Sequence, residues 1–263
     1  MSPHRKENVR MVAAEFAKKL RNREKVVGYW AVLDAPIATE RIARLGYDYV
    51  AIDGQHGLVG YSGILNGMLA IDAGGRSAGL VRVEANDLTA IGRSLDAGAA
   101  GVIVPLVDDA ADAAKAVHAT RYPPHGGRSY GPMRSGLRIG PKPAEADAAT
   151  VVLAMIETPQ GLANVEEICA TPGLDGVYVG PSDLCLAVGG AFPGDPAVAD
   201  AFEDAVTAVR EAAAKAGIAA GIHTPNGETA ARRLAEGYTF ASVASDVVHL
   251  EQIAAAHLKA ATE

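Results

Sequence analysis

Short apolar runs rich in β-branched residues alternate with longer amphipathic segments along the 263 residues of this chain. The apolar runs are typical of strands, and the segments after them have helical periodicity. The predicted strands are Val26–Val32, Tyr47–Asp53, Ala78–Val83, Gly101–Pro105, Val151–Glu157, Gly176–Gly180, Gly217–His223 and Thr239–Ala244. The predicted helices are Ile37–Leu45, Ser62–Ala73, Leu88–Ala97, Ala110–Thr120, Leu162–Ala170, Ala197–Ala216, Glu228–Glu236 and Asp246–Ala261.

The predicted strands are continuous apolar runs without strict alternation, which is typical of a parallel sheet covered by helices. Eight strand–helix units in 263 residues fit a closed (β/α)₈ barrel better than a doubly wound open sheet, because such barrels commonly use about 250 residues. No linker or composition break divides the chain into two domains. We therefore predict an α/β fold, with residues 1–263 as a single TIM barrel domain.

Two segments fall outside the eight units. Residues Asn8–Glu24 place Val12, Phe16 and Leu20 at helical spacing, which predicts an extra helix at the base of the barrel within an extension over residues 1–24. The alternative for this segment is a frayed tail. Residues Arg121–Ala149 are dense in Gly, Pro and Arg, so we expect one long irregular insertion between the fourth helix and the fifth strand.

The charge balance disfavours two classes of partner. The chain has 24 Lys and Arg against 31 Asp and Glu, and this net charge of −7 opposes binding to nucleic acid or anionic lipid. No run reaches the roughly 18 apolar residues of a membrane span, and the first residues lack the apolar core of a secretion signal. Cys169 and Cys185 have no metal-site spacing and predict buried thiols in a reducing cytoplasm.

Polar residues follow several predicted strands at their carboxyl ends, where TIM barrels carry their active sites. They are Asp53, Gln55 and His56 after the second strand, Arg82 in the third, Glu157 at the end of the fifth, Ser182 and Asp183 after the sixth, and His223 at the end of the seventh. Because parallel strands of one barrel end at the same rim, the pattern predicts a site that combines a base, an arginine and carboxylates.

Glu157 and Asp183 follow consecutive strands, so their carboxylates are expected to meet. Two hard oxygen ligands that leave positions open for water and substrate favour Mg²⁺ or Mn²⁺. Such a metal would bind a 2-oxo acid through its carboxylate and keto oxygens and stabilise an enolate. The alternative is that Glu157 pairs with an arginine and that Asp183 caps the following helix.

The other rim residues have both catalytic and structural interpretations. His56 can act as a general base, because an imidazole titrates near physiological pH, and Asp96 would raise its basicity if the two were close. Asp53 orients either the adjacent backbone or a metal-bound water, or it only forms a turn before Gly54. Arg82 suits a substrate carboxylate or an enolate oxygen, or an ion pair within the barrel. No lysine ends a predicted strand, which disfavours a Schiff-base aldolase.

Together these segments resemble the HpcH/HpaI aldolases, the metal-dependent class II pyruvate aldolases of the phosphoenolpyruvate/pyruvate barrel superfamily. The resemblance runs from about Gly28 to His257. The segments that carry it are Asp53-Gly54-Gln55-His56, Val81-Arg82-Val83, Leu95-Asp96-Ala97-Gly98, Val104-Pro105, Arg121-Tyr122-Pro123-Pro124, Ile156-Glu157-Thr158 and Gly180-Pro181-Ser182-Asp183-Leu184.

The resemblance implies roles for individual residues. Glu157 and Asp183 would hold a divalent metal, Mg²⁺, Mn²⁺ or Co²⁺, and His56 paired with Asp96 would form the catalytic base. Arg82 would stabilise the pyruvate enolate. Substrate is expected at Arg82, Met155, Gly180 and Pro181, and at the backbone amides of Ser182 and Asp183.

The implied activity is reversible cleavage of a 4-hydroxy-2-oxo acid into pyruvate, or hydroxypyruvate, and an aldehyde through a metal-bound enolate. Members are typically hexamers that exchange the last helix, so Asp246–Ala261 is expected to be domain-swapped between subunits. The alternatives are decarboxylation of a 2-oxo acid such as oxaloacetate, cleavage of coenzyme A thioesters, and a barrel that only binds a ligand.

Three positions depart from the family pattern. Many members carry Glu at the position of Gln55 and Gln at the position of Met155. Because a thioether accepts hydrogen bonds poorly, a polar contact to substrate or metal-bound water is expected to be lost at Met155. Many members carry an apolar residue at the position of His223. His223 therefore adds a polar contact at the rim, to which we assign no role.

Overall fold

The computed structural model describes residues 3–263, with side chains described from Val12 onward. Eight parallel strands form a closed barrel in chain order, and β8 pairs with β1. The strands are β1 (Val26–Ala31), β2 (Tyr49–Asp53), β3 (Ala78–Arg82), β4 (Gly101–Val104), β5 (Val151–Ile156), β6 (Gly176–Val179), β7 (Ala219–Thr224) and β8 (Phe240–Ser245). The predicted TIM barrel is confirmed, and every strand lies within two residues of its predicted bounds.

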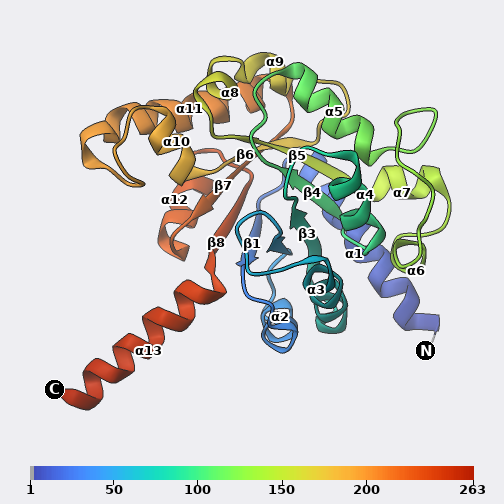
Figure 1. The fold of residues 1–263 in the computed structure, drawn as a ribbon, viewed down its shortest axis with the longest axis horizontal. Helices are drawn as coiled ribbons and strands as arrows, with labels where there is room; N and C mark the ends of the chain where they lie inside the picture. Colours follow the sequence, from blue (N-terminus) through green and yellow to red (C-terminus); the bar gives the residue numbers. More distant parts are fainter. Residues whose placement is uncertain (1–2) are drawn as a thin grey trace.

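Helices surround the barrel, as Figure 1 shows. They are α1 (Pro3–Arg21), α2 (Pro36–Ala43), α3 (Tyr61–Gly74), α4 (Leu88–Asp96), α5 (Ala110–Thr120), α6 (Ser135–Arg138), α7 (Pro143–Ala149), α8 (Pro159–Ala163), α9 (Val165–Cys169), α10 (Pro181–Ala187), the 3₁₀ helix η1 (Pro196–Val198), α11 (Ala199–Ala216), α12 (Gly227–Glu236) and α13 (Asp246–Thr262).

Three helical regions differ from the prediction. Residues 121–149 are not one irregular insertion, because they contain α6 and α7, and Pro143 at the start of α7 has the fixed backbone angle that suits a first helical turn. The single helix predicted over Leu162–Ala170 is two short helices that meet at Asn164, whose side chain donates to the carbonyl of Asp108. The short α10, which also begins at a proline, was not predicted.

Aromatic side chains fill the inside of the barrel. Tyr49, Tyr178 and Phe240 are fully buried, and the hydroxyl groups of both tyrosines bond to Ser242 Oγ at 2.8 and 2.7 Å. A Cβ on Gly28 would lie 2.1 Å from the Tyr49 ring, so the neighbouring strand needs glycine there. A second apolar layer lies between the outside of the strands and the helices. This packing excludes a pore and leaves open only the carboxyl ends of the strands.

Helix α1 covers the amino ends of the strands. Leu20 is fully buried, and the Phe16 ring lies 5.6 Å from the Tyr49 ring. Arg21 donates to Asp175 Oδ1 at 2.7 Å and to the carbonyl of Thr150 at 2.9 Å, and these residues directly precede β6 and β5. The predicted helix at the base of the barrel is therefore confirmed, and it begins earlier than Asn8.

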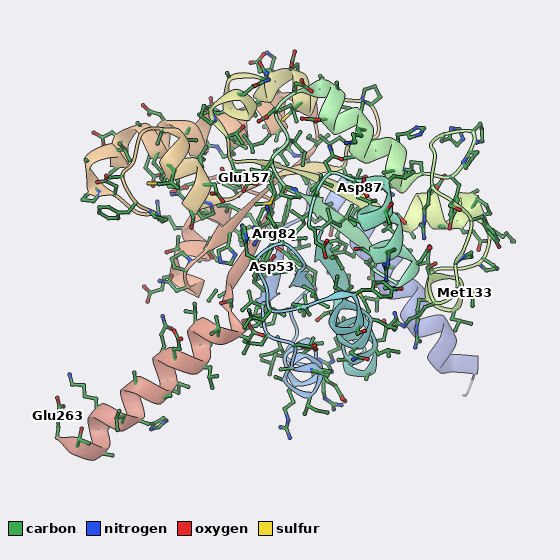
Figure 2. All side chains as sticks on the ribbon, viewed as in Figure 1. Asp53, Arg82, Asp87, Met133, Glu157 and Glu263 are labelled. Carbon is green, nitrogen blue, oxygen red and sulfur yellow. The ribbon has the colours of Figure 1, made fainter. Side chains whose placement is uncertain are left out.

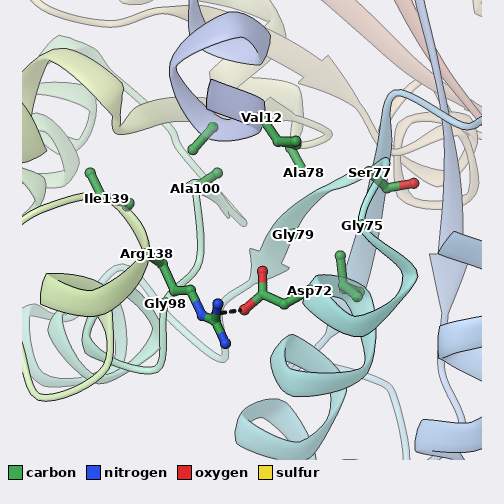
Figure 3. Close-up of a pocket in the computed structure, with 12 residues that line it drawn as sticks. Val12, Asp72, Gly75, Ser77, Ala78, Gly79, Gly98, Ala100, Arg138 and Ile139 are labelled. Carbon is green, nitrogen blue, oxygen red and sulfur yellow. Dashed lines mark ion pairs between the residues drawn. The ribbon is translucent and has the colours of Figure 1, made fainter. Parts of the chain in front are cut away.

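Residues 121–149 pack against the outside of α3 near the amino ends of β3 and β4. Arg138 Nε lies 3.0 Å from Asp72 Oδ2 at the edge of a small hollow (Figure 3), and Arg134 pairs with the same carboxylate. Burial raises the pKa of Asp72, and the two guanidinium groups oppose that rise. The hollow belongs to this packing contact and lies at the opposite end of the barrel from the carboxyl ends of the strands.

Helix α13 extends away from the barrel and ends far from it (Figure 1). Asp246 joins its first turn to the end of β1 by accepting from the backbone amides of Val32 and Leu33 at 2.9 and 3.2 Å. Beyond that turn the helix has no buried residue. Val248 still packs against the core, but Leu250, Ile253 and Leu258 are exposed and face no partner within the described part of this chain.

Candidate active site

A cavity of about 240 Å³ lies at the carboxyl ends of the strands. Its volume is below the roughly 300–1,000 Å³ of sites for drug-sized ligands, which suits a ligand of few atoms. The lining residues are Trp30, Val32, His56, Arg82, Met155, Tyr178, Gly180, Pro181, Ser182, Asp183, His223 and Ser245. Among the predicted site residues, the structure thus places His56, Arg82, Met155, Gly180, Pro181, Ser182 and Asp183 around one cavity.

Glu157 directly follows β5 and is 3% exposed. Its Oε1 accepts from the backbone amide of Leu106 at 2.9 Å, and Leu106 adopts a left-handed conformation with φ of 54°. Its Oε2 is buried and has no hydrogen-bond partner among the described residues. Burial raises the pKa of Glu157, and the nearby Asp183 carboxylate raises it further. Burying a carboxylate oxygen without a partner is energetically costly, so the partner that Oε2 lacks is a cation or a hydrogen-bond donor.

Gly180 allows the close approach of Glu157 to the start of α10. A Cβ on Gly180 would lie 2.3 Å from Glu157 Oε2 and 2.9 Å from Met155 Cε, so any other residue would displace one of them. Asp183 lies in the first turn of α10 and is partly buried. The glycine therefore brings the Glu157 carboxylate close to the helix that carries Asp183.

The two carboxylates fit a divalent cation. Glu157 and Asp183 are hard oxygen donors close enough to raise the pKa of Glu157, and Glu157 Oε2 has no partner in the described residues. Among the side chains that the structure describes, from Val12 to Glu263, no group of three or more His, Cys, Asp or Glu could hold a metal. Water and substrate would therefore supply the other ligands.

Arg82 and Asp53 form a buried ion pair beside the cavity (Figure 2), and the charge of Arg82 also acts on Glu157. Arg82 donates to Asp53 from Nε at 2.9 Å and also from Nη2, and its guanidinium lies 5.2 Å from the Trp30 ring. Burial alone would raise the pKa of Asp53, but the hydrogen bonds and charge of Arg82 lead the contacts that hold it below its usual value. Arg82 thus forms an ion pair within the barrel, as its structural interpretation predicted, and it also lines the cavity.

Asp53 also holds the turn that carries His56. Its Oδ1 accepts from the backbone amides of Gln55 and His56 at 3.1 and 3.0 Å, and its Oδ2 accepts from Trp30 Nε1 at 3.2 Å. At 2% exposure, Asp53 does not line the cavity. It positions Arg82 and His56, which do.

The structure does not bring His56 and Asp96 together within one chain. His56 follows β2 at the carboxyl end of the barrel, whereas Asp96 is the last residue of α4 and lies near the amino end of β4. Asp96 accepts a hydrogen bond from Arg128 at 2.8 Å, and the Arg128 side chain is 1% exposed. Because a buried guanidinium needs a partner, Arg128 is directed toward Asp96 and not toward the cavity.

His223 and Trp30 are part of the site, although neither received a role from the sequence. The His223 ring contacts the Trp30 ring edge-on with centroids 5.4 Å apart, and Trp30 stacks on Tyr178 at 5.7 Å. Burial and the charge of Arg82 lower the pKa of His223 to about 4, so the ring is neutral at pH 7. The sequence signal that could have assigned them to the site is their position near the carboxyl ends of β7 and β1.

Comparison with known proteins decides the family. The family model for HpcH/HpaI aldolase/citrate lyase matches residues 26–252. The chain belongs to this family. A hydroxypyruvate/pyruvate aldolase of Rhizorhabdus wittichii is similar, at 41% identity over 86% of this chain and 89% of that protein. A 4-hydroxy-2-oxovalerate aldolase of Rhodococcus jostii is 38% identical over 88% of this chain and 89% of that protein.

The solved structures agree with this assignment. The crystal structure of a family protein from Burkholderia cenocepacia superimposes with a TM-score of 0.86 at 31% identity, covering 95% of this chain and 99% of that one. As an HpcH/HpaI family member with aldolase relatives, the protein is a carbon–carbon lyase. The alternative of a barrel that only binds a ligand is therefore wrong. None of the helices in the described residues has the length and hydropathy needed to cross a bilayer.

Proposed function

We propose that the protein is a divalent-metal-dependent class II aldolase that reversibly cleaves 4-hydroxy-2-oxo acids to pyruvate, or hydroxypyruvate, and an aldehyde. The buried Glu157 carboxylate, with its unpartnered Oε2 beside Asp183, carries the proposal. Two relatives are named for hydroxypyruvate, pyruvate and 4-hydroxy-2-oxovalerate, which are 2-oxo acids of this class. The small cavity suits such compounds.

Glu157 and Asp183 would hold Mg²⁺, Mn²⁺ or Co²⁺, which when bound polarises the substrate oxygens as a Lewis acid. Arg82, held in place by Asp53, directs positive charge to the enolate oxygen. The backbone amides of Ser182 and Asp183, in the first turn of α10, are left without helical partners and would receive the substrate carboxylate.

A metal-supplemented assay with product identification tests this function. EDTA should abolish release of pyruvate from 4-hydroxy-2-oxo acids, and Mn²⁺ or Mg²⁺ should restore it. Mass analysis should find the aldehyde among the products, whereas CO₂ released from oxaloacetate without any aldol cleavage would support the decarboxylase instead. Retained activity in EDTA, or trapping of pyruvate on a lysine by borohydride, would exclude the metal mechanism.

His56 is the proposed general base, because its exposed side chain lines the cavity. His56→Ala is expected to lower the turnover number by about 10² to 10⁴, the usual contribution of a general base. Steady-state assays with excess Mn²⁺ measure the effect. The control is His125→Ala, an exposed histidine in the segment 121–149, and a His56→Ala turnover equal to that of the control would show that His56 is not the base.

Within one chain, His56 and Asp96 lie at opposite ends of the barrel. We therefore propose that Asp96 completes the base only across a contact between two copies. Coexpression of differently tagged His56→Ala and Asp96→Asn chains tests this. A mixed assembly then contains sites with an intact His56 from one chain and an intact Asp96 from the other, and part of the activity should return. No recovery in purified mixed assemblies would contradict the shared base.

We also propose a homo-oligomer, a hexamer by family resemblance, in which α13 is exchanged between subunits. The support is an exposed apolar stripe on α13 with Leu250, Ile253 and Leu258 at 59%, 57% and 67% exposure. Changing all three residues to Ser is expected to lower the mass measured by light scattering, whereas Gln252→Ala on the same helix should not. A wild-type protein that is monomeric at micromolar concentration would contradict this assembly.

The remaining predictions concern partners and location. Small 2-oxo acids and aldehydes are the proposed substrates, and the net charge of −7 supports the absence of nucleic-acid and membrane partners. Both cysteines are free and buried, in agreement with the small buried residues expected. The cytoplasmic location stays a prediction from cysteine usage.

A further inference from the structure

One polar side chain in the cavity has no role in the proposed reaction. His223 lies near the end of β7, opposite Ser242 of β8, and lines the cavity beside Arg82 and Met155. Its Nδ1 is buried without a hydrogen-bond partner among the described residues. Buried polar groups in proteins are almost always hydrogen-bonded. Because the imidazole ring lines the cavity and no described residue bonds to its Nδ1, a molecule that enters the cavity is the partner expected for this ring.

The indole of Trp30 places His223 relative to Arg82. The Arg82 guanidinium carbon lies 5.2 Å from the centre of the Trp30 ring, and the His223 ring lies 5.4 Å from it, so both groups border the same end of the cavity. Arg82 is proposed to face the enolate oxygen on C2 of the donor. A group beside Arg82 is therefore positioned to reach a substituent on C3, the neighbouring carbon.

Three aromatic or sulfur-containing residues of this wall, Trp30, Tyr178 and Met155, offer few hydrogen bonds. Trp30 uses its ring N–H on Asp53, Tyr178 donates its hydroxyl to Ser242 inside the barrel, and the Met155 thioether is a weak acceptor. The methyl group that forms C3 of pyruvate would leave His223 without a partner, whereas the hydroxyl group that C3 of hydroxypyruvate carries could both donate and accept.

We propose that His223 is a specificity-determining residue, which hydrogen-bonds a hydroxyl group on C3 of the 2-oxo acid and so favours hydroxypyruvate over pyruvate as the donor. This inference rests on the proposed function, because it uses the donor position set by Glu157, Asp183 and Arg82. Burial and the charge of Arg82 keep the imidazole neutral, and a neutral ring has one donor and one acceptor nitrogen.

The ratio of kcat/KM for hydroxypyruvate to that for pyruvate, measured with Mn²⁺ and one aldehyde, tests the proposal. His223→Leu should lower this ratio about ten- to a hundredfold, because a site built around a hydroxyl group loses its selectivity when the bond is removed. The kcat/KM for pyruvate should change less than about threefold. His223→Gln, which keeps a donor and an acceptor, should recover part of the ratio. An unchanged ratio, or an equal fall with both donors, would overturn the proposal.

Fluorescence gives a second measurement that does not depend on turnover. Trp30 is the single tryptophan of the chain and contacts His223, so its emission reports ligand binding at this wall. Titration of the Mn²⁺-loaded protein with each acid should show that His223→Leu raises the Kd for hydroxypyruvate about tenfold or more, with little change for pyruvate. Equal Kd changes for the two acids would overturn the proposal.

The two measurements separate this inference from the proposed function. If the wild-type protein binds both acids but cleaves no 4-hydroxy-2-oxo acid, the aldolase proposal fails, and the fluorescence Kd values still decide the role of His223. If it binds neither acid, the donor position is wrong and the inference fails with it.

Discussion

Glu157→Gln should abolish metal-dependent aldol cleavage while it stabilises the metal-free protein. The activity should fall about a thousandfold or more, because a bound metal contributes several kcal/mol of transition-state stabilisation and each 1.4 kcal/mol is about a factor of ten. The amide keeps the shape of the carboxylate and can still accept from Leu106, but it lacks the charge that holds a divalent cation.

The gain in stability follows from the raised pKa of Glu157. The folded state holds this proton more tightly than the unfolded state, so the free energy of unfolding falls as pH rises from the ordinary value of 4.5 through the folded pKa. At pH 7 the ionised, unpartnered carboxylate therefore destabilises the metal-free fold, and an uncharged amide should relieve part of that penalty. Bound Mn²⁺ should stabilise the wild-type protein and leave the variant unchanged.

Thermal unfolding in EDTA and in Mn²⁺, combined with steady-state assays, measures both effects. Glu167→Gln, on the exposed side of α9, is the matched control and should change neither. A Glu157→Gln protein that melts below the wild type in EDTA would show that Glu157 is partnered in solution by a group of the protein. One that retains its turnover would show that Glu157 does not hold the catalytic metal.

Arg82→Met should lower both stability and activity by large amounts. It leaves Asp53 buried and ionised without its guanidinium partner, and breaking a buried ion pair in this way typically costs about 3–5 kcal/mol. It also removes the positive charge from the cavity, for which we expect a loss in kcat of about 10² to 10³. The stability that the ion pair contributes is present above the ordinary Asp pKa of 3.8 and is lost as pH falls through the lower folded pKa of Asp53.

The double variant Arg82→Met with Asp53→Asn separates the two effects. Because it removes the uncompensated charge, it should recover much of the unfolding free energy measured in urea while the activity stays low. Arg82→Lys keeps the charge but cannot form the two-pronged contact with Asp53, so it should be intermediate in both properties. Recovery of activity in the double variant would show that Arg82 acts only through the ion pair.

The barrel was predictable because its signals are local. Each strand is a short apolar run, each outer helix has its own periodicity, and the two follow one another in chain order. The rim positions of Arg82, Glu157 and Asp183 follow from the same pattern, because the carboxyl ends of parallel strands meet at one end of a barrel. The sequence by itself therefore determined the fold, the end that carries the site, and most of the residues around the cavity.

Only the tertiary structure decided which of these residues are partners. Barrel closure sets β1 beside β8, and the inward-facing side chains of Trp30 and His223 then meet across the mouth. Asp96 ends a helix and so lies at the opposite end of the barrel from His56, the residue with which the family resemblance pairs it. Leu106 donates its backbone amide to Glu157, and because the backbone makes this hydrogen bond, the identity of the side chain does not predict it. Sequence patterns record the environment of each residue along its own element, whereas these contacts depend on how distant elements meet in space.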